Sequence, residues 1–312
     1  MPEPTAAIEV AGLTKRYGPP ETGLVAVDHI DFEVRPGEIF GFLGPNGAGK
    51  TTTIRMLTGL SRPTAGHARV LGLDLARDMP RIKKKIGVVP EASNLYAELT
   101  ALDNLIFSMQ LYGVPRRERA RRAEELLDRF RLAGKRDVPF ARLSRGMKRA
   151  LTIAAALAHR PALLFLDEPT TGLDVISARG LRQMIAGFSD EGVTVFLTTH
   201  YLEEAERLCD RIALLVQGQI VALDTVEGLT ASMQEATTVE VTLAGDTDGT
   251  ETRRVVDNDV AAAVQASLAG AQAEGRRVLA VNTVRPTLED VFVQLTGLSA
   301  DVMRAEKGGK GG

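Results

Sequence analysis

The residues best suited to chemistry begin with a glycine-rich loop that ends in a lysine and a hydroxyl. Residues 44–52 read Gly-Pro-Asn-Gly-Ala-Gly-Lys-Thr-Thr, which fits the spacing Gly-x4-Gly-Lys-[Ser/Thr]. Backbone N–H groups of such a loop can turn toward an anion, while Lys50 supplies a charge and Thr51 a hydroxyl for Mg²⁺. The sequence therefore predicts a polyphosphate site formed by Gly44, Pro45, Asn46, Gly47, Ala48, Gly49, Lys50, Thr51 and Thr52.

Two adjacent carboxylates follow a second apolar run. Residues 163–166 read Leu-Leu-Phe-Leu, and Asp167 and Glu168 come directly after them. A carboxylate at the tip of a strand beside a phosphate loop is placed to hold Mg²⁺, the role we predict for Asp167. The next carboxylate points elsewhere and can orient or deprotonate an attacking water, so we predict that Glu168 is the general base. A pair of solvated acids is the simpler alternative, and the upstream loop disfavours it.

A histidine follows a third apolar run in the same way. Thr198, Thr199 and His200 come after the run at 193–197. An imidazole at a strand end near a phosphate site can donate to the γ-phosphate and report its presence. A lone histidine is more often structural, but the place of His200 directly after a core strand favours a role at the phosphate site.

These groups need a scaffold of strands that end at one edge of a sheet. Apolar runs that alternate with helical stretches are typical of βαβ crossovers, so the sequence predicts an α/β fold with a mainly parallel sheet. The run before the loop is continuously apolar, as expected for a strand buried on both faces. The predicted strands are Ile39–Leu43, Ile86–Val89, Leu163–Leu166, Val193–Leu197 and Ile212–Val216, and the helix after the loop is Thr51–Leu60.

Three further regions complete the predicted organisation. Alternating apolar and polar residues predict an antiparallel edge sheet from Ile8–Val10 and Leu24–Val34, and a helical subdomain covers about 95–160. We predict one domain over 1–225, a small α/β domain over 226–299, and a disordered tail over 300–312, which is poor in apolar side chains. The elements predicted in the second domain are strand Thr238–Leu243, loop 244–249, helix Asp259–Ala273, strand Val278–Val281 and helix Thr287–Leu295.

Composition limits the partners and the compartment. The net charge is −2 and 25% of the 312 residues are charged, so no overall field attracts nucleic acid. The arginine-rich segment 115–131 carries interleaved acids and predicts a solvated helix face. Cys209 is the only cysteine, which favours a reducing cytosol and a small buried side chain. No apolar run approaches the ~18–20 residues of a membrane helix, and we see no signal peptide.

In the order of its motifs the chain resembles the ATP-binding cassette family, the ATPase subunits of membrane transporters, over about residues 8–223. The segment 143–149, Leu-Ser-Arg-Gly-Met-Lys-Arg, resembles the family signature at the start of a helix. Residues 171–174, Thr-Gly-Leu-Asp, match the loop after the metal-binding aspartate. Tyr17 falls where the family stacks an aromatic ring on adenine, and a surface aromatic in a turn is the alternative.

The resemblance implies a P-loop NTPase core and a head-to-tail pair of subunits that binds ATP and Mg²⁺. ATP would lie between the phosphate loop of one subunit and Ser144, Gly146 and Asp174 of the other. Hydrolysis would then remove the contacts that close the pair. The resemblance also implies an integral-membrane permease as partner and a position on the cytoplasmic face of the membrane. The intact motifs allow a homodimer but do not decide between identical and different partners. Exposed apolar residues after Val89, such as Leu95 and Tyr96, are expected to receive the permease, and packing in the core is the alternative.

Two residues depart from the family pattern. Glu91 stands where the family has a glutamine that offers a neutral oxygen to Mg²⁺, and we predict that Glu91 still ligates the metal. Arg145 replaces the first of two signature glycines, a substitution shared with exporter-type relatives. The segment 285–292, Arg-Pro-Thr-Leu-Glu-Asp-Val-Phe, resembles the end of ATPase subunits from bacterial multidrug, daunorubicin-type and sodium exporters.

Two other functions remain open at this point. One is a soluble cassette ATPase that acts on nucleic acid or ribosomes. Such proteins usually carry a long coiled coil or a second cassette, and this sequence has neither. The other is a regulatory nucleotide-binding protein without turnover, which the presence of Lys50, Asp167, Glu168 and His200 disfavours. The prediction is therefore an ATPase that powers transport, most plausibly export.

Overall fold

The chain forms two compact units. The computed structural model describes residues 6–19, 21–231, 237–244, 250–257, 260–284, 286–299 and 301–304. The first unit runs to Thr225 and also contains the segment from Ser299, whereas the second is Val226–Leu298. Residues 245–249 of the loop predicted at 244–249, the predicted helix start at Asp259, the motif residue Arg285 and residues 305–312 lie outside the described part of the chain, whereas Ala244 ends a strand.

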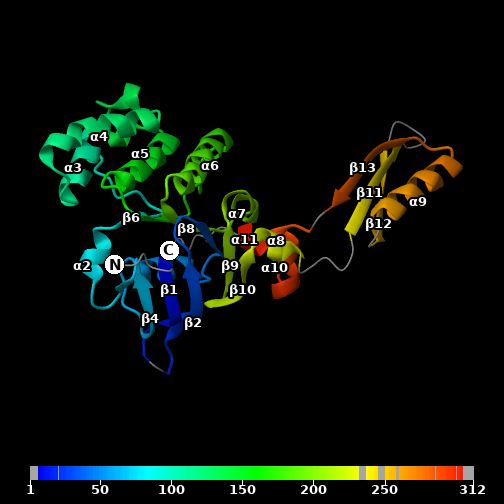
Figure 1. Ribbon diagram of the computed structural model, residues 1–312, viewed down its shortest axis with the longest axis horizontal. Coiled ribbons are helices and arrows are strands. Elements are labelled where there is room, and N and C mark those ends of the chain that lie inside the picture. The colour runs from blue at the N-terminus through cyan, green and yellow to red at the C-terminus, as the bar shows by residue number, and fades with distance from the viewer. Residues whose placement is uncertain are drawn as a thin grey trace, which may run out of the picture. The chain divides into compact units, whose positions relative to one another are not determined.

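The core of the first unit is a six-stranded sheet in the order β10-β9-β3-β8-β7-β6. Figure 1 labels four of these strands, β6, β8, β9 and β10. The five strands from β9 to β6 are parallel, and only β10 pairs antiparallel, with β9. The parallel strands are almost entirely buried, as expected for strands covered on both faces, which explains their continuous apolar runs. The strands are β3 (Ile39–Leu43), β6 (Ile86–Val89), β7 (Leu163–Asp167), β8 (Thr194–Thr199), β9 (Arg211–Val216) and β10 (Gln219–Thr225).

A second, antiparallel sheet in the order β2-β1-β4-β5 packs on the first through Phe32 of β2, whose ring lies 5.7 Å from that of Phe40 and 6.0 Å from that of Phe196. β1 is longer than the Ile8–Val10 strand predicted from the sequence. β4 was not predicted because most of its side chains are exposed and leave no apolar alternation. The strands are β1 (Ile8–Tyr17), β2 (Leu24–Val34), β4 (Ala65–Val70) and β5 (Leu73–Asp74).

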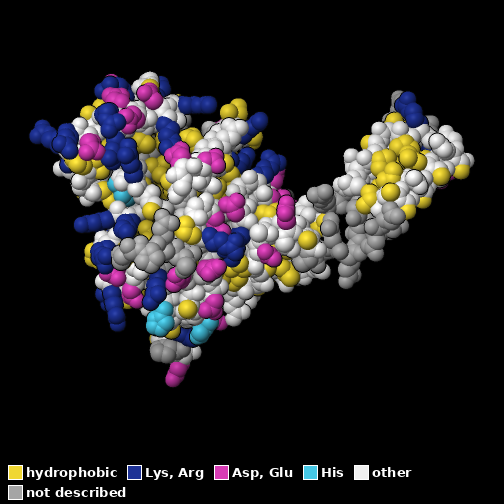
Figure 2. Space-filling view, in the orientation of Figure 1, with side chains coloured by type: hydrophobic (Ala, Val, Ile, Leu, Met, Phe, Trp, Pro, Cys, Tyr) yellow, Lys and Arg dark blue, Asp and Glu magenta, His cyan; other side chains and the backbone are white. Residues whose placement is uncertain are grey.

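Seven α-helices connect these strands in the described first unit before Thr225. Acid–base pairs line the arginine-rich helix α4, such as Arg122 with Glu118 at 2.7 Å, and Figure 2 shows basic and acidic side chains intermixed over this region. None of the helices described has the length and apolarity to cross a membrane. They are α1 (Lys50–Leu57), α2 (Met79–Lys83), α3 (Ala101–Leu111), α4 (Arg116–Arg129), α5 (Arg145–Leu157), α6 (Val175–Asp190) and α7 (Leu202–Leu208), with 3-10 turns η1 (Ala133–Lys135) and η2 (Phe140–Arg142).

The second unit contains an antiparallel sheet in the order β12-β11-β13. Buried Val239 and Val241 of β11 pack with Ala263 of α9, and this small core explains the alternation seen in the sequence. β12 was not predicted because its residues are mainly polar. The elements are α8 (Val226–Ala231), β11 (Thr237–Ala244), β12 (Thr250–Asp257), α9 (Val260–Ala273), β13 (Val278–Val284) and α10 (Leu288–Thr296).

A short helix lies inside the segment that the sequence predicts to be a disordered tail. This helix, α11 (Asp301–Arg304), belongs to the first unit, and Met303 in it is only 1% exposed. The sequence prediction is therefore wrong for these residues. The error arises because a single buried methionine provides too little apolar periodicity to be recognised.

Candidate active site

The predicted site residues converge because three parallel strands end at the same edge of the sheet. β8 lies between β3 and β7, so the loops after all three strands are neighbours. In the strand register Leu43 is opposite Thr199, and Thr198 is opposite Asp167. Ligands bind outside the carboxyl ends of strands in open α/β sheets, and this edge carries the phosphate loop, Glu168 and His200 together.

The phosphate loop takes its shape from Gly49, which caps α1. Its φ of 112° lies in the left-handed region that favours glycine. A Cβ atom there would meet the carbonyl oxygen of Ala26 at 2.4 Å, so no side chain fits between the loop and β2. The loop therefore turns tightly into an eight-residue helix, the arrangement that aims backbone N–H groups and the helix dipole at an anion.

Lys50 is buried in the centre of this edge, with only 5% of the residue exposed. Its Nζ donates to the carbonyl oxygens of Gly44 at 2.5 Å and Pro45 at 3.3 Å. The same ammonium lies 3.2 Å from Oε1 of Glu168. The structure thus joins the loop lysine directly to the carboxylate predicted to be the general base.

Glu168 bridges Lys50 and His200. Its Oε2 accepts a hydrogen bond from Nδ1 of His200 at 2.8 Å and another from the Thr171 hydroxyl at 3.2 Å. Burial raises the pKa of the Glu168 carboxyl, but the hydrogen bond from His200 and the charge of Lys50 outweigh burial, so the pKa lies below its ordinary value. The backbone φ of Glu168 is 49°, a strained value for a non-glycine residue that is typical of functional sites.

Asp167 and Thr51 form an oxygen-rich pair beside this cluster. Oδ1 of Asp167 accepts from the Thr51 hydroxyl at 3.3 Å and from the Thr198 hydroxyl at 2.6 Å. Burial raises the pKa of Asp167, while the two hydroxyls act in the opposite direction. The sequence predicts no role for Thr198, because a threonine in a strand carries no signal that its hydroxyl orients a carboxylate.

The donor set suits a hard cation that completes its shell with phosphate oxygens. Mg²⁺ takes oxygen ligands and is usually bound by one or two protein groups together with substrate phosphates, so Thr51 and Asp167 fit it. Among the described residues no group of three His, Cys, Asp or Glu side chains could hold a metal alone. Glu91 is exposed and lines an adjoining cavity of about 270 Å³ with Arg145 and Lys148.

Arg149 of α5, which was not predicted from the sequence, holds the loops of Asp167 and Glu91 together. The residue is 7% exposed, and its guanidinium donates to backbone carbonyls of both loops. Burial lowers the pKa of Arg149 to about 10, although nearby carboxylates oppose the shift. An arginine among charged neighbours is normally exposed, so the sequence offered no signal. The acceptors are Asp167 at 2.7 Å, Glu168 at 2.9 Å, Pro169 at 2.8 Å, Pro90 at 2.5 Å and Glu91 at 3.3 Å.

Ser144, Gly146 and Asp174 lie together where α5 and α6 begin. The Ser144 hydroxyl caps α5 by accepting from the backbone N–H of Met147 at 3.2 Å. Asp174 caps α6 through the N–H and hydroxyl of Ser177, at 2.9 and 2.7 Å. A Cβ atom on Gly146 would meet Oγ of Ser177 at 2.6 Å, so a larger side chain there would displace Ser177 or separate the two helix ends. The structure therefore groups these three predicted residues at one surface.

Tyr17 lies at the end of β1 and is 42% exposed. Nζ of Lys15 lies 5.0 Å from the centre of its ring, a cation–π arrangement. An exposed aromatic face at a strand end is compatible with base stacking, and the role of Tyr17 at adenine stays a prediction.

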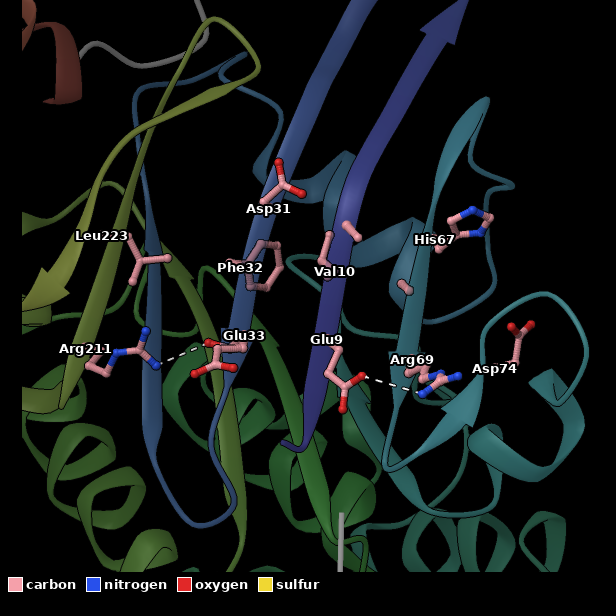
Figure 3. Close-up of a pocket in the computed structure, with 12 residues that line it drawn as sticks. Glu9, Val10, Asp31, Phe32, Glu33, His67, Arg69, Asp74, Arg211 and Leu223 are labelled. Carbon is pink, nitrogen blue, oxygen red and sulfur yellow. Dashed lines mark hydrogen bonds and ion pairs between the residues drawn. The ribbon is translucent and has the colours of Figure 1, made fainter. Parts of the chain in front are cut away.

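A larger hollow of about 850 Å³ crosses β1, β2, β4 and the edge of β9 and β10 (Figure 3). Phe32 contributes to its wall. Glu9 lies 4.0 Å from Arg69, and Arg211 donates to the backbone carbonyl oxygen of Glu33 at 3.2 Å. None of the predicted nucleotide residues lines it. The strand-end cluster, rather than this hollow, is therefore the candidate active site.

Sequence comparisons relate this chain to known transport proteins. The family model described as "ABC transporter" matches residues 27–171. The linearmycin resistance ATP-binding protein LnrL of Bacillus subtilis (strain 168) is 35% identical over 309 residues, covering 93% of this chain and 98% of that protein. The daunorubicin/doxorubicin resistance ATP-binding protein DrrA of Streptomyces peucetius is 37% identical, covering 98% of this chain and 97% of that protein.

A third relative and two solved structures agree with these matches. The Nod factor export ATP-binding protein I of Mesorhizobium japonicum (strain LMG 29417 / CECT 9101 / MAFF 303099) is 43% identical over 70% of this chain and 63% of that protein. An ATP-binding subunit of an ABC transporter has a TM-score of 0.65 and 32% identity over 73% of this chain and 93% of its own. The ATP-binding cassette MJ0796, solved as a dimer with ADP and phosphate, has a TM-score of 0.65 and 27% identity over 70% and 98%.

Proposed function

This chain belongs to the ABC transporter family, and on that premise we propose how its residues bind and hydrolyse ATP. The chain is an ATP-binding, ATP-hydrolysing subunit that powers translocation, and its relatives in drug resistance and Nod factor export support export as the direction. The observation that carries the residue assignment is the contact chain from Lys50 through Glu168 to His200, at 3.2 and 2.8 Å.

Within one subunit the phosphates of ATP bind to the N–H groups of the loop at 44–52 and to Lys50. Glu168 orients a water and accepts its proton as the water oxygen bonds to the γ-phosphorus and the bond to the β–γ bridging oxygen breaks. His200 donates through Nδ1 to Glu168, which leaves Nε2 for the γ-phosphate.

Mg²⁺ is the cation that we propose for Thr51, Asp167 and Glu91. When bound, it would neutralise charge on the phosphate oxygens. The close approach of Thr51 to Asp167 supports the first two ligands. For Glu91 the support is that Arg149 binds the backbone carbonyls of residues 90 and 91 and so ties this loop to the end of β7.

Replacing Glu91 by alanine tests that third ligand. Losing an oxygen ligand is expected to raise the Mg²⁺ concentration for half-maximal ATPase activity by about tenfold or more. Titration of MgCl₂ at fixed ATP measures this value, and Glu91→Gln serves as the matched control because it keeps one carbonyl oxygen. An unchanged Mg²⁺ requirement in Glu91→Ala would show that the carboxylate is no ligand.

We further infer that the active form is a pair of these chains, with a composite ATP site between them. Ser144 and Gly146 at the start of α5 would face the γ-phosphate held by the partner's loop, where helix N–H groups attract an anion. Asp174 would lie in the same interface. Support comes from the grouping of these residues on one surface and from the dimeric cassette structure to which the chain is similar.

The contact between Gly146 and Ser177 provides a test of this composite site. Gly146→Ala should push the ends of α5 and α6 apart, because the new Cβ has only 2.6 Å to Oγ of Ser177. In a Glu168→Gln background, where turnover is blocked, we expect ATP to dimerise the chain. Adding Gly146→Ala should weaken that dimer by about tenfold or more, and Ser177→Gly should restore part of the loss.

Size-exclusion chromatography with light scattering, with and without ATP, measures the dimer. Gly180→Ala is the matched control, since a Cβ on this α6 glycine meets no atom within 4 Å. A chain that stays monomeric at saturating ATP would refute the composite site. An equal dissociation constant of the ATP-dependent dimer with and without the Gly146→Ala substitution would refute the role of the N-terminal end of α5.

The remaining partner in the proposal is an integral-membrane permease, with this subunit peripheral on the cytoplasmic face. Tyr96, 51% exposed after β6, packs edge-on against Phe107 of α3 with ring centres 5.1 Å apart. A partly exposed aromatic pair is suited to receive an apolar helix of the permease, and hydrolysis at the sheet edge would reach it through the loop after Val89.

A further inference from the structure

Glu204 is a buried carboxylate that the activity described above does not use. It lies on α7, is 2% exposed, and follows the loop that carries His200. Its Oε1 is buried and has no hydrogen-bond partner among the described residues. Burying a carboxyl in this way costs free energy, and in the described chain its hydrogen bonds come from two hydroxyls, while Arg182 acts on it through its charge. Such a group requires a compensating contact or a functional reason.

The contacts of Glu204 connect the two catalytic loops. Its Oε2 accepts from the Thr170 hydroxyl at 2.9 Å and from the Thr199 hydroxyl at 2.9 Å. Thr170 lies two residues after Glu168, and Thr199 directly precedes His200. A single oxygen atom therefore holds both loops at one point, and both threonines are buried.

The rest of the surroundings tighten this arrangement. The Thr199 hydroxyl also accepts from the backbone N–H of Tyr201 at 3.0 Å, so the turn around His200 is fixed from both sides. In the same loop, Arg149 donates to the carbonyl oxygens of Asp167 and Glu168. The Glu168 loop is thus held between a buried cation from α5 and a buried carboxyl from α7.

We propose that Glu204 is a positioning residue for ATP hydrolysis: through Thr170 and Thr199 it sets the approach of Glu168 to His200. The inference rests on the proposed roles of those two residues. In this role the buried carboxyl of Glu204 aligns the general base, Glu168, with the donor to the γ-phosphate, His200. Displacements of about 1 Å at a reacting centre can reduce a rate by about 100-fold, so a clamp of this kind affects turnover strongly.

The first experiment replaces Glu204 by methionine, a side chain of similar length without charge. We expect kcat for ATP hydrolysis to fall by about 10- to 100-fold, while KM and ATP affinity stay within about twofold. The midpoint of thermal unfolding should be unchanged or higher, because an incompletely paired buried carboxyl is removed. A kcat within twofold of the parent, or a loss of kcat that follows a loss of stability or ATP affinity, would overturn the proposal.

A second experiment separates a clamp from two independent local contacts. Thr170→Val and Thr199→Val each remove one hydroxyl and keep the side-chain shape. If Oε2 of Glu204 ties the loops together, breaking either bond releases the tie, so the double variant should lose no more kcat than the worse single variant. If the kcat loss of the double variant equals the product of the two single losses, the two contacts act independently and the proposed positioning role of Glu204 is wrong. Thr58→Val is the control, since this buried hydroxyl donates only to the helix carbonyl of Ile54, at 2.7 Å.

The two proposals fail in different ways. If Glu168→Gln retained the parental turnover, the assignment of the general base would be wrong. Glu168→Gln could be inactive while the kcat losses of Thr170→Val and Thr199→Val multiply in the double variant. The assignment of Glu168 as general base would then hold, and the positioning role of Glu204 would be wrong. Measuring kcat, KM and ATP affinity for all variants, purified and assayed under the same conditions, distinguishes these outcomes.

Discussion

Replacing Glu168 by glutamine is expected to reduce kcat for ATP hydrolysis by about 10²–10⁴-fold, the usual effect of losing a general base. The amide keeps the shape of the carboxylate but cannot accept a proton. Lys50 stays next to the phosphate loop, so the dissociation constant for ATP should remain within about fivefold. Steady-state phosphate release and equilibrium binding of a fluorescent ATP analogue measure the two quantities.

The matched control for this variant is Glu203→Gln. Glu203 lies on α7 and pairs at the surface with Arg207, at 2.6 Å and with a side chain 76% exposed. Exposed pairs of this kind contribute about 0–1 kcal/mol to stability, so the control should hydrolyse ATP at the parental rate. Parental turnover in Glu168→Gln itself would show that another group activates the water.

Replacing Lys50 by alanine should act on binding rather than on chemistry alone. Hydrogen bonds to charged groups contribute about 1.5–3 kcal/mol, so losing the ammonium is expected to weaken ATP binding by about 10- to 100-fold. Hydrolysis should fall as well, because Glu168 loses the cation that lies 3.2 Å from its Oε1. Calorimetric titration with ATP and a phosphate-release assay at saturating ATP separate the two effects.

Lys83→Ala is the control for charge removal, since Lys83 ends α2 and is exposed. It changes the net charge by the same amount without touching the phosphate loop. ATP affinity that is equal in Lys50→Ala and Lys83→Ala would contradict the role of Lys50 at the phosphates. A loss of affinity in both variants would point to the general charge of the subunit instead.

Much of the fold was recognisable from local patterns. The continuous apolar runs at 39–43, 163–166 and 193–197 predicted buried parallel strands, and the structure contains all three. The signal was strong because such strands are covered on both faces. β4 and β12, whose side chains are largely exposed or polar, gave no comparable pattern and were missed. Burial of the strand therefore decided whether the sequence revealed it.

The candidate site likewise contains some residues that the sequence predicted and others that it did not. Lys50, Asp167, Glu168 and His200 were predicted because each follows an apolar run in a short motif, and the structure places them at one sheet edge. Arg149 and Glu204 are also buried but were not recognised, because Arg149 follows a basic run and Glu204 lies among charged residues, where an exposed side chain is the usual expectation. Their partners are backbone carbonyls and hydroxyls from other loops, which no spacing rule connects to them.

By itself, the sequence determined which chemical groups are present and in what order: the glycine loop, the lysine, two carboxylates and the histidine. The tertiary structure alone decided that β8 enters the sheet between β3 and β7. That insertion brings His200 to 2.8 Å from Glu168, a residue 32 positions away. The physical reason is that secondary-structure propensity and hydrophobic periodicity depend on residues that are close together in the sequence. Contacts between loops instead depend on strand order and on buried polar groups finding partners across the fold.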